Sequence, residues 1–130
     1  MRITGIQETC LYASNLTEVK SFYKKLPGIQ LHSEESGRHL FFKTGSGMLL
    51  IFNPDETLKE GDVPSHGANG SVHAAFAVPD GTLDQWKAHL RDHEIEIEQD
   101  KMWPNGTRSL YFRDPAGNSL ELITKDLWES

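Results

Sequence analysis

The chain repeats one pattern of strands and a helix twice. Residues 5–13 alternate in polarity as a strand does, and residues 15–26 carry apolar side chains at helical spacing. Three short strand patterns follow, at residues 29–32, 39–43 and 48–52. The same order then returns as a strand at residues 71–78, a helix from residue 82, and strands at residues 94–98, 109–113 and 119–123. We therefore predict two β-α-β-β-β modules.

The repeat extends to individual residues. His-Leu-Phe-Phe-Lys at 39–43 matches Ser-Leu-Tyr-Phe-Arg at 109–113, and residues 49–52 match residues 120–123. A period of about 65 residues is longer than most solenoid repeats, which favours duplication of a whole module. We predict one domain over residues 1–130, with module one at about 3–53, a linker at 54–70 and module two at about 71–124.

The composition argues against several kinds of partner. The 13 Lys and Arg residues are scattered and are outnumbered by 19 Asp and Glu, which disfavours binding to nucleic acid. No apolar run approaches the roughly 20 residues of a membrane span, and none follows a signal-peptide layout. The single cysteine cannot form an internal disulfide. We expect a cytoplasmic protein with no membrane or nucleic-acid partner.

Three ionisable side chains stand among apolar neighbours on the predicted strands. Strand parity places Glu8, His73 and Glu121 on the face that is turned away from the helix of their module. A carboxylate in such a place is costly unless it is paired or metal-bound. Carboxylate and imidazole ligands together suit a divalent ion such as Mn, Fe, Zn, Ni or Mg. Each residue alone is equally consistent with a solvated or hydrogen-bonded strand position, and no local motif joins the three.

Three segments of the chain resemble the vicinal oxygen chelate superfamily, which includes glyoxalase I, fosfomycin-resistance proteins, extradiol dioxygenases and bleomycin-binding proteins. These segments are residues 8–23, residues 70–78 and residues 111–122, and in the last a turn at 114–118 (Asp-Pro-Ala-Gly-Asn) precedes Leu-Glu-Leu. The resemblance implies an α+β fold in which the two modules form an open, cup-shaped mixed β-sheet, as in glyoxalase-like proteins. It further implies a homodimer whose site is shared between chains.

The resemblance also implies that Glu8, His73 and Glu121 hold the metal-ligand positions, with two departures from the usual pattern. The first ligand is usually His and is Glu8 here, which shifts the preference toward oxygen-loving metals. Glyoxalase-type members have a fourth ligand, a Glu, where this chain has Leu50, or Ile51 if the gap is placed differently. Three ligands with open positions fit the fosfomycin-resistance or extradiol pattern better than glyoxalase proper.

Other side chains near the predicted ligands are candidates for substrate contact. They are Tyr12, Phe52, Trp103, Ser109, Tyr111 and Arg113. The Arg113 guanidinium could hold a carboxylate or phosphonate, or it could be a surface Arg next to Asp114. His66 in the linker could carry a proton, or simply be exposed. Since Glu8 or Glu121 could also act as a base, the catalytic candidates are Glu8, Glu121 and His66.

Three functions remain open on this basis. The leading hypothesis is a small metal-dependent enzyme that chelates or polarises a small oxygen-bearing substrate in lyase, isomerase or transferase chemistry. The alternative is a metal-free binding protein of the bleomycin-resistance type, in which Tyr12, Phe52 and Trp103 would matter most. The third is an iron-dependent extradiol-type dioxygenase, which Glu8 disfavours because the usual facial triad has two His.

Overall fold

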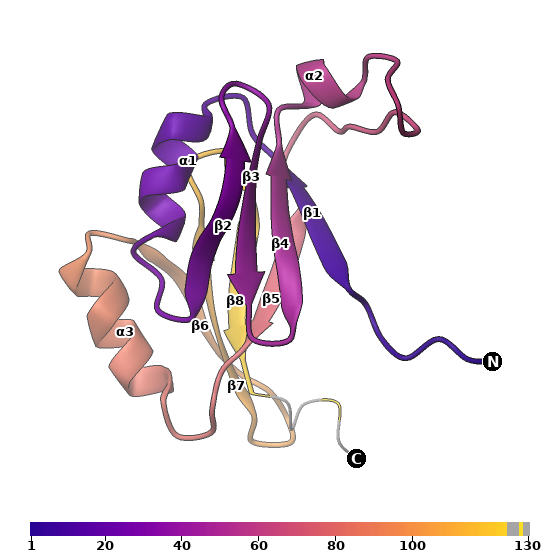
Figure 1. Ribbon diagram of the computed structural model, residues 1–130. Coiled ribbons are helices and arrows are strands. Elements are labelled where there is room, and N and C mark those ends of the chain that lie inside the picture. The colour runs from indigo at the N-terminus through magenta and orange to yellow at the C-terminus, as the bar shows by residue number, and fades with distance from the viewer. Residues whose placement is uncertain (125–127, 129–130) are drawn as a thin grey trace. The chain divides into compact units, whose positions relative to one another are not determined.

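The computed structural model describes residues 1–124 and 128, and the chain divides into two compact units, Met1–Gly70 and Ser71–Ser130 (Figure 1). The first unit contains β1 (Glu8–Tyr12), α1 (Leu16–Tyr23), β2 (Ile29–Glu35), β3 (His39–Thr44), β4 (Gly47–Phe52) and α2 (Pro54–Thr57). The second contains β5 (His73–Ala77), α3 (Leu83–Asp92), β6 (Ile97–Met102), β7 (Arg108–Arg113) and β8 (Ser119–Ile123). Apart from α2, the two units have the same order of elements, which confirms the predicted modules.

Each unit folds into one four-stranded mixed sheet. The strand order is β1-β4-β3-β2 in the first and β5-β8-β7-β6 in the second. In both, the first strand runs parallel to the last and the remaining pairs are antiparallel. Even the bulge is repeated, since the register shifts between Leu31 and Ser33 in β2 and between Ile97 and Gln99 in β6. The α+β fold class is therefore confirmed.

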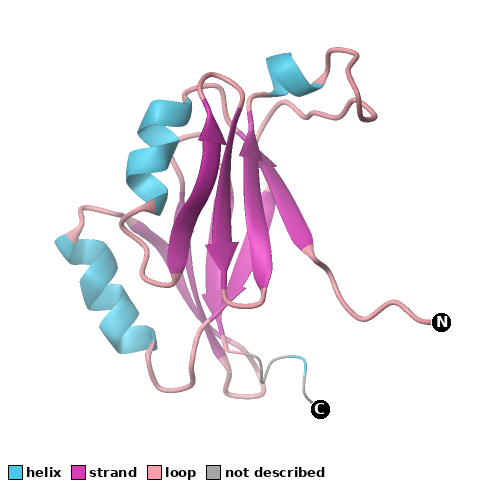
Figure 2. Cartoon of the chain, in the orientation of Figure 1, coloured by secondary structure: helices cyan, strands magenta, loops and turns pink. Residues whose placement is uncertain are grey.

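One helix covers one face of each sheet, and strand parity decides which side chains it buries (Figure 2). In the first unit, Leu40, Phe42 and Ile51 are at most 2% exposed, and the ring of Tyr23 on α1 lies 5.6 Å from that of Phe42. In the second unit the equivalent buried side chains are Leu110, Phe112, Leu120 and Leu122. Side chains of the opposite parity, on the face away from the helix, include every predicted metal ligand.

Helix α1 begins where the sequence predicts. The Asn15 side chain accepts a hydrogen bond from the backbone N–H of Glu18 at 3.1 Å, so it satisfies one of the free donors of the first turn. Leu16, Val19 and Phe22 then recur on the buried face. The helix ends before Gly28, whose φ of 93° is a conformation that glycine adopts without strain.

Two local features differ from the sequence prediction. The linker contains the short helix α2, which Asn53 caps by accepting a hydrogen bond from the Asp55 backbone at 3.1 Å. Strand β6 begins at Ile97 rather than at residue 94. The reason is the end of α3: Glu94 takes a φ of 60°, and the Ile95 N–H donates to the carbonyl of Leu90 at 2.8 Å. These residues terminate the helix and are not available to the strand.

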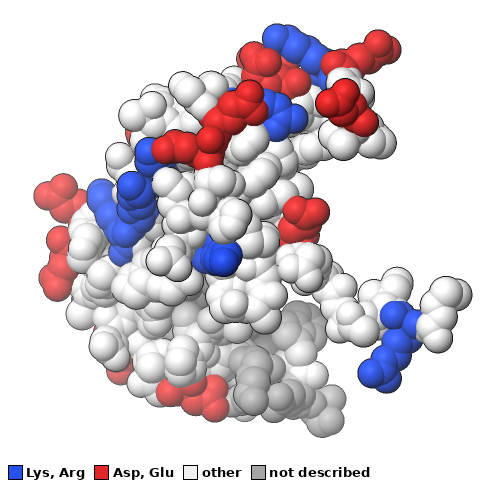
Figure 3. Space-filling view, viewed as in Figure 1, with Lys and Arg blue, Asp and Glu red and all other residues white. Residues whose placement is uncertain are grey.

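The surface carries mixed charge. On the face shown in Figure 3, acidic side chains gather over α2 and the linker that follows it, and a smaller group of basic side chains lies over α1 at the left edge. Within the described part of the chain, no helix has the length and apolar character needed to cross a membrane.

Candidate functional site

His73 and Glu121 meet on the open face of the second sheet. His73 is the first residue of β5, Glu121 is the middle residue of β8, and the two strands are paired in parallel. The imidazole Nε2 lies 3.3 Å from the carboxylate Oε1. Glu121 is only 6% exposed, whereas half of the His73 side chain is open to solvent. The pair therefore places a buried carboxylate oxygen and a solvent-accessible imidazole nitrogen, both able to bind a metal, next to each other.

The other nitrogen of His73 is held by the backbone. Nδ1 donates a hydrogen bond to the carbonyl oxygen of Ser119 at 2.9 Å. With its proton on Nδ1, a neutral imidazole has its lone pair on Nε2, which is the atom that faces Glu121. Metal-binding histidines are commonly oriented by this kind of second bond.

The turn between β7 and β8 fixes the start of β5. Asp114 is only 4% exposed. It accepts hydrogen bonds from the backbone N–H groups of Ala116 and Asn118 and from the Asn118 side chain. Asn118 in turn accepts from the backbone N–H of Val72 at 3.1 Å, one residue before His73. The buried Asp and Asn of the turn do this positioning, and their spacing of four residues in the sequence was the available signal.

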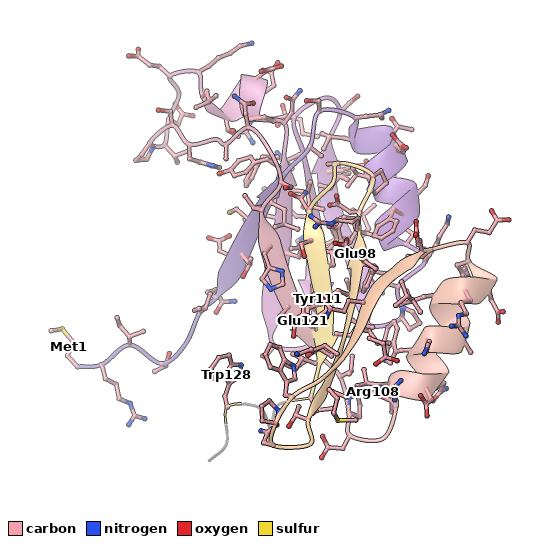
Figure 4. The ribbon with its side chains drawn as sticks, turned by 180° about the vertical axis from the view of Figure 1, so that it is seen from behind. Met1, Glu98, Arg108, Tyr111, Glu121 and Trp128 are labelled. Atoms are coloured by element: carbon pink, nitrogen blue, oxygen red, sulfur yellow. The ribbon has the colours of Figure 1, made fainter. Side chains whose placement is uncertain are left out.

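Polar side chains of β7 and the loop before it lie near the Glu121 carboxylate. The Trp103 indole, which can only donate, bonds to the hydroxyl oxygen of Ser109 at 2.9 Å. Tyr111 and Glu121 are cross-strand partners on β7 and β8, side by side in Figure 4. Burial first, and then the charge of Glu121, raise the pKa of Tyr111, so the phenol keeps its proton beside the carboxylate.

The spacing of the pair suits a divalent metal ion. Two ligand bonds of about 2.1 Å, at an angle of about 100°, place their ligand atoms about 3.2 Å apart. The Nε2 to Oε1 distance of 3.3 Å agrees with that value. Among the residues that the structure describes, no group of three or more His, Cys, Asp and Glu side chains is gathered as a complete metal site. The second unit thus brings two of the three predicted ligands together.

The third predicted ligand, Glu8, belongs to the first unit. It is the first residue of β1 and is exposed, as His73 is the first residue of β5. The counterpart of Glu121 is Leu50, since Leu50 pairs with Phe41 as Glu121 pairs with Tyr111. Leu50 is 7% exposed and has no atom that can bind a metal. The structural register therefore assigns Leu50, and not Ile51, to the position of the fourth ligand.

Tyr12 and His66 form a hydrogen-bonded pair in the first unit. The Tyr12 hydroxyl lies 2.6 Å from Nδ1 of His66, and the His66 ring meets Phe52 edge-on at 4.8 Å. Burial, with a smaller effect of Cys10, raises the pKa of Tyr12, so the phenol has a proton to donate. The linker backbone supports this pair, because His66 N–H donates to the carbonyl of Thr57 at 3.0 Å.

Arg113 and Arg108 are both engaged by acidic side chains. Arg113, on the same face as Glu121, makes a two-point contact with Glu98 at 2.7 and 3.1 Å and also donates to the Gly117 carbonyl. Arg108 binds Asp100 and Asp84, each at 2.8 Å, beside a surface depression of about 570 Å³ at the start of α3. Hydrogen bonds from Arg108 and Lys87 hold the pKa of Asp100 well below its ordinary value. These contacts are structural ion pairs, and the structure brings neither arginine to the His73–Glu121 pair.

The comparison with family models finds a match over residues 5–122, to the model described as the Glyoxalase/Bleomycin resistance protein/Dioxygenase superfamily. Among curated relatives, the chain is 25% identical over 130 residues to the metallothiol transferase FosB of Staphylococcus epidermidis (strain ATCC 12228 / FDA PCI 1200), covering 98% of this chain and 86% of that protein. It is 26% identical to the protein of the same name from Bacillus licheniformis, covering 98% and 80% respectively.

Solved structures agree with this match. The crystal structure of a lactoylglutathione lyase from Agrobacterium tumefaciens has a TM-score of 0.95 and 38% sequence identity, with both chains covered completely. The fosfomycin resistance protein FosX from Mesorhizobium loti has a TM-score of 0.69 at 20% identity, with 98% of each chain covered. The second likeness concerns the fold alone.

Proposed function

Because the chain belongs to the glyoxalase/bleomycin resistance protein/dioxygenase superfamily, we propose that it is a small metal-dependent enzyme of the glyoxalase or fosfomycin-resistance type. The proposed substrate is a small molecule with oxygen atoms that bind the metal, and the chemistry is that of a lyase, isomerase or transferase. The names of its relatives, a metallothiol transferase and a lactoylglutathione lyase, support this range of reactions.

The observation that carries the proposal is the His73–Glu121 pair. A carboxylate that is 6% exposed sits 3.3 Å from an imidazole nitrogen whose ring is oriented by Ser119. The Tyr111 hydroxyl interacts with the same carboxylate. A buried carboxylate is costly without a partner, and a cation bound to Glu121 and to Nε2 of His73 would supply that partner.

Glu8 is the proposed third ligand. It occupies in β1 the position that His73 occupies in β5, which supports an equivalent role. The proposed ligand set is then two carboxylates and one imidazole, with open positions for substrate. Such a set favours Mn²⁺, Fe²⁺ or Mg²⁺ over softer ions, although Zn²⁺ and Ni²⁺ also accept imidazole and carboxylate.

The protein groups around the proposed site have separate tasks in this mechanism. A divalent ion bound there would supply Lewis acidity, polarising a substrate oxygen. Glu121 or Glu8 is placed to accept a proton, and His66, bonded to Tyr12, is a second proton carrier from the linker. Tyr111, the cross-strand partner of Glu121, would hold the carboxylate in one orientation, and Trp103 fixes the Ser109 side chain beside it on β7. Phe52 and Tyr12 are proposed substrate contacts, and Arg113 reaches substrate only if Glu98 releases it.

We further propose that the protein is a cytoplasmic homodimer in which the site is shared between chains. The support is the family membership and the observation that the second unit provides two ligands while Glu8 lies on the first. Isologous dimers are the commonest oligomers of soluble proteins.

Metal analysis tests the proposal. Protein purified without chelator should contain about one divalent ion per chain, and Glu121→Ala should lose it. Glu98→Ala is the matched control, because Glu98 is an exposed acid on β6 of the same sheet and binds Arg113. A folded wild-type protein that neither retains nor takes up a divalent ion would refute the metalloenzyme. It would favour the metal-free binding protein, for which the aromatic side chains of the first unit are the supporting observation.

A further inference from the structure

Aromatic and imidazole side chains gather on the open face of the first sheet. The His39 ring stacks on Phe41 at 3.9 Å with an angle of 8° between planes, and Phe52 meets both rings edge-on at 5.9 and 5.6 Å. His66 and Tyr12 complete the group through Phe52, at 4.8 and 6.5 Å. We call these five residues the aromatic cluster. Its members come from β1, β3, β4 and the linker.

Arg38 adds a fixed positive charge at the edge of the cluster. Its guanidinium carbon is 5.7 Å from the centre of the Phe52 ring, and Nη1 donates to Nδ1 of His39 at 2.8 Å. The Arg38 backbone is held on both sides, by the carbonyl of Glu35 at 3.0 Å and the N–H of Asn53 at 2.8 Å. A carboxylate oxygen of Glu35 is 3.9 Å from Arg38 Nε, and the Glu35 side chain is 62% exposed. A solvated carboxylate of this kind is easily displaced by a ligand.

The imidazoles of the cluster present N–H donors. Burial first, and then Arg38, lower the pKa of His39, which keeps the ring neutral. Because its Nδ1 accepts from Arg38, the proton lies on Nε2. In the tautomer whose Nδ1 accepts from the Tyr12 hydroxyl, His66 also carries an N–H on Nε2. The cluster thus combines flat aromatic walls, imidazole N–H donors and one guanidinium.

The matching face of the second unit has the opposite chemistry. Phe41 and Leu50 occupy the paired positions that Tyr111 and Glu121 occupy there, so the first unit has no carboxylate at this point. A face with aromatic walls and cationic donors complements a flat, negatively charged molecule.

We infer that the aromatic cluster and Arg38 bind an organic anion with a planar, conjugated body, such as an aromatic carboxylate. The ring of the ligand packs against Phe41 and Phe52, and its carboxylate takes hydrogen bonds from Arg38 and an imidazole N–H. This inference deepens the proposed function by naming a substrate class, and it rests on that function only where it calls the anion a substrate.

Benzoate is the probe that tests the inference. Full-length protein is stripped of metal with chelator and titrated while amide chemical shifts are followed by NMR. We expect saturable shifts at residues 38–41 and 52, and about tenfold weaker binding in Arg38→Gln, since hydrogen bonds to a charged group contribute this much. Lys43→Gln is the matched control, because Lys43 is an exposed cation on the same face of β3. It should leave benzoate binding unchanged.

Two further ligands test the contributions of the aromatic ring and of the negative charge separately. Cyclohexanecarboxylate has the same charge without an aromatic face, and it should bind more weakly than benzoate. Benzyl alcohol has the ring without the charge, so Arg38→Gln should not change its binding. A Phe41→Leu variant whose other amide shifts match the wild type should also lose the preference for benzoate over cyclohexanecarboxylate.

The inference is overturned if benzoate shifts fall elsewhere, if Arg38→Gln binds as well as Lys43→Gln, or if the two carboxylates bind equally. Its failure is distinct from failure of the proposed enzyme. Protein that takes up no metal but binds benzoate through Arg38 keeps the inference and refutes the metalloenzyme. Protein that binds metal through Glu121 but does not bind benzoate refutes this inference and leaves the proposed metalloenzyme standing.

Discussion

Glu121 shows how neighbouring side chains decide the chemistry of one residue. It is a buried acid between Leu120 and Leu122, which by itself would be a costly arrangement. Tyr111 interacts with it across the strand pair, and Nε2 of His73 lies 3.3 Å from it. The carboxylate that we assign to a metal therefore has one neighbour, Tyr111, that need not touch the ion and one, His73, that is itself a proposed ligand.

A Tyr111→Phe variant tests the role of this neighbour. It removes the hydroxyl that interacts with Glu121 and leaves the ring in place. We expect metal affinity to fall at least about tenfold, because loss of an outer partner commonly has this effect, with little change in fold. Competition with a chromogenic chelator measures the affinity. Tyr12→Phe is the control and should keep wild-type affinity; equal losses in both variants would contradict the assigned role of Tyr111.

Gly67 sets the position of His66. A Cβ at Gly67 would lie 2.6 Å from the Leu58 side chain, so any larger residue must push the linker away. We expect Gly67→Ala to lower the free energy of unfolding by about 1 kcal/mol through this overpacking. Gly61→Ala is the control, since nothing lies within 4 Å of a Cβ there. Chemical denaturation measures both variants. The penalty should vanish when Leu58 is already Ala, and its persistence would exclude the Leu58 clash.

At the scale of elements, the sequence predicts strands and helices well wherever polarity alternates with a clear period. It could not predict α2 or the start of β6. Helix α2 is a single turn with no apolar repeat, and the position of β6 depends on Glu94 adopting a positive φ. The polar face was predicted at His73 and Glu121, whereas the contact between them, and the partners of Trp103, depend on packing across strands. Periodicity along one segment carries no such information.

The turn before β8 is predicted to control the start of β5. Asn118→Ala removes the acceptor of the Val72 N–H and a donor to buried Asp114. We expect unfolding free energy to fall by about 1–3 kcal/mol, because buried groups lose their partners. Hydrogen exchange at Val72 should also accelerate. Asn69→Ala, in the exposed linker, should change neither quantity. Slow exchange at Val72 in Asn118→Ala would show that the turn does not hold this strand.

Asp100 joins β6 to β7 and α3 by ion pairs, and its contribution should depend on pH. Arg108 and Lys87 lower its pKa in the folded protein, so the ionised form stabilises the fold. This stability is present above the pKa of about 3.9 that an unfolded chain has, and it is lost as the pH falls toward the lower folded pKa. Asp100→Asn should therefore cost about 1 kcal/mol at pH 7 and progressively less below about pH 4. Denaturant unfolding across pH measures the difference; a constant difference would exclude the ion pairs as its source.

At the scale of the whole molecule, duplication has produced two sheets of the same topology with different open faces. The second carries Glu121 and Tyr111, and the first carries Leu50 and Phe41 at the same positions. We interpret this as a difference in role: the second face carries two of the three proposed metal ligands, and the first carries Glu8 and the aromatic cluster. Analytical ultracentrifugation should find a homodimer, as the shared site requires. A monomer that binds metal fully would show that one chain provides every ligand.

The central claim is that His73 binds a divalent metal through Nε2, beside Glu121. Stoichiometric Mn²⁺ is added to chelator-treated protein with ¹⁵N-labelled or unlabelled histidine, and electron spin-echo spectroscopy detects nitrogen bonded to the ion. We predict a histidine nitrogen signal that changes with the label, disappears in His73→Gln and persists in His89→Gln. A signal that survives in His73→Gln, or bound Mn²⁺ without any histidine nitrogen, would contradict the account.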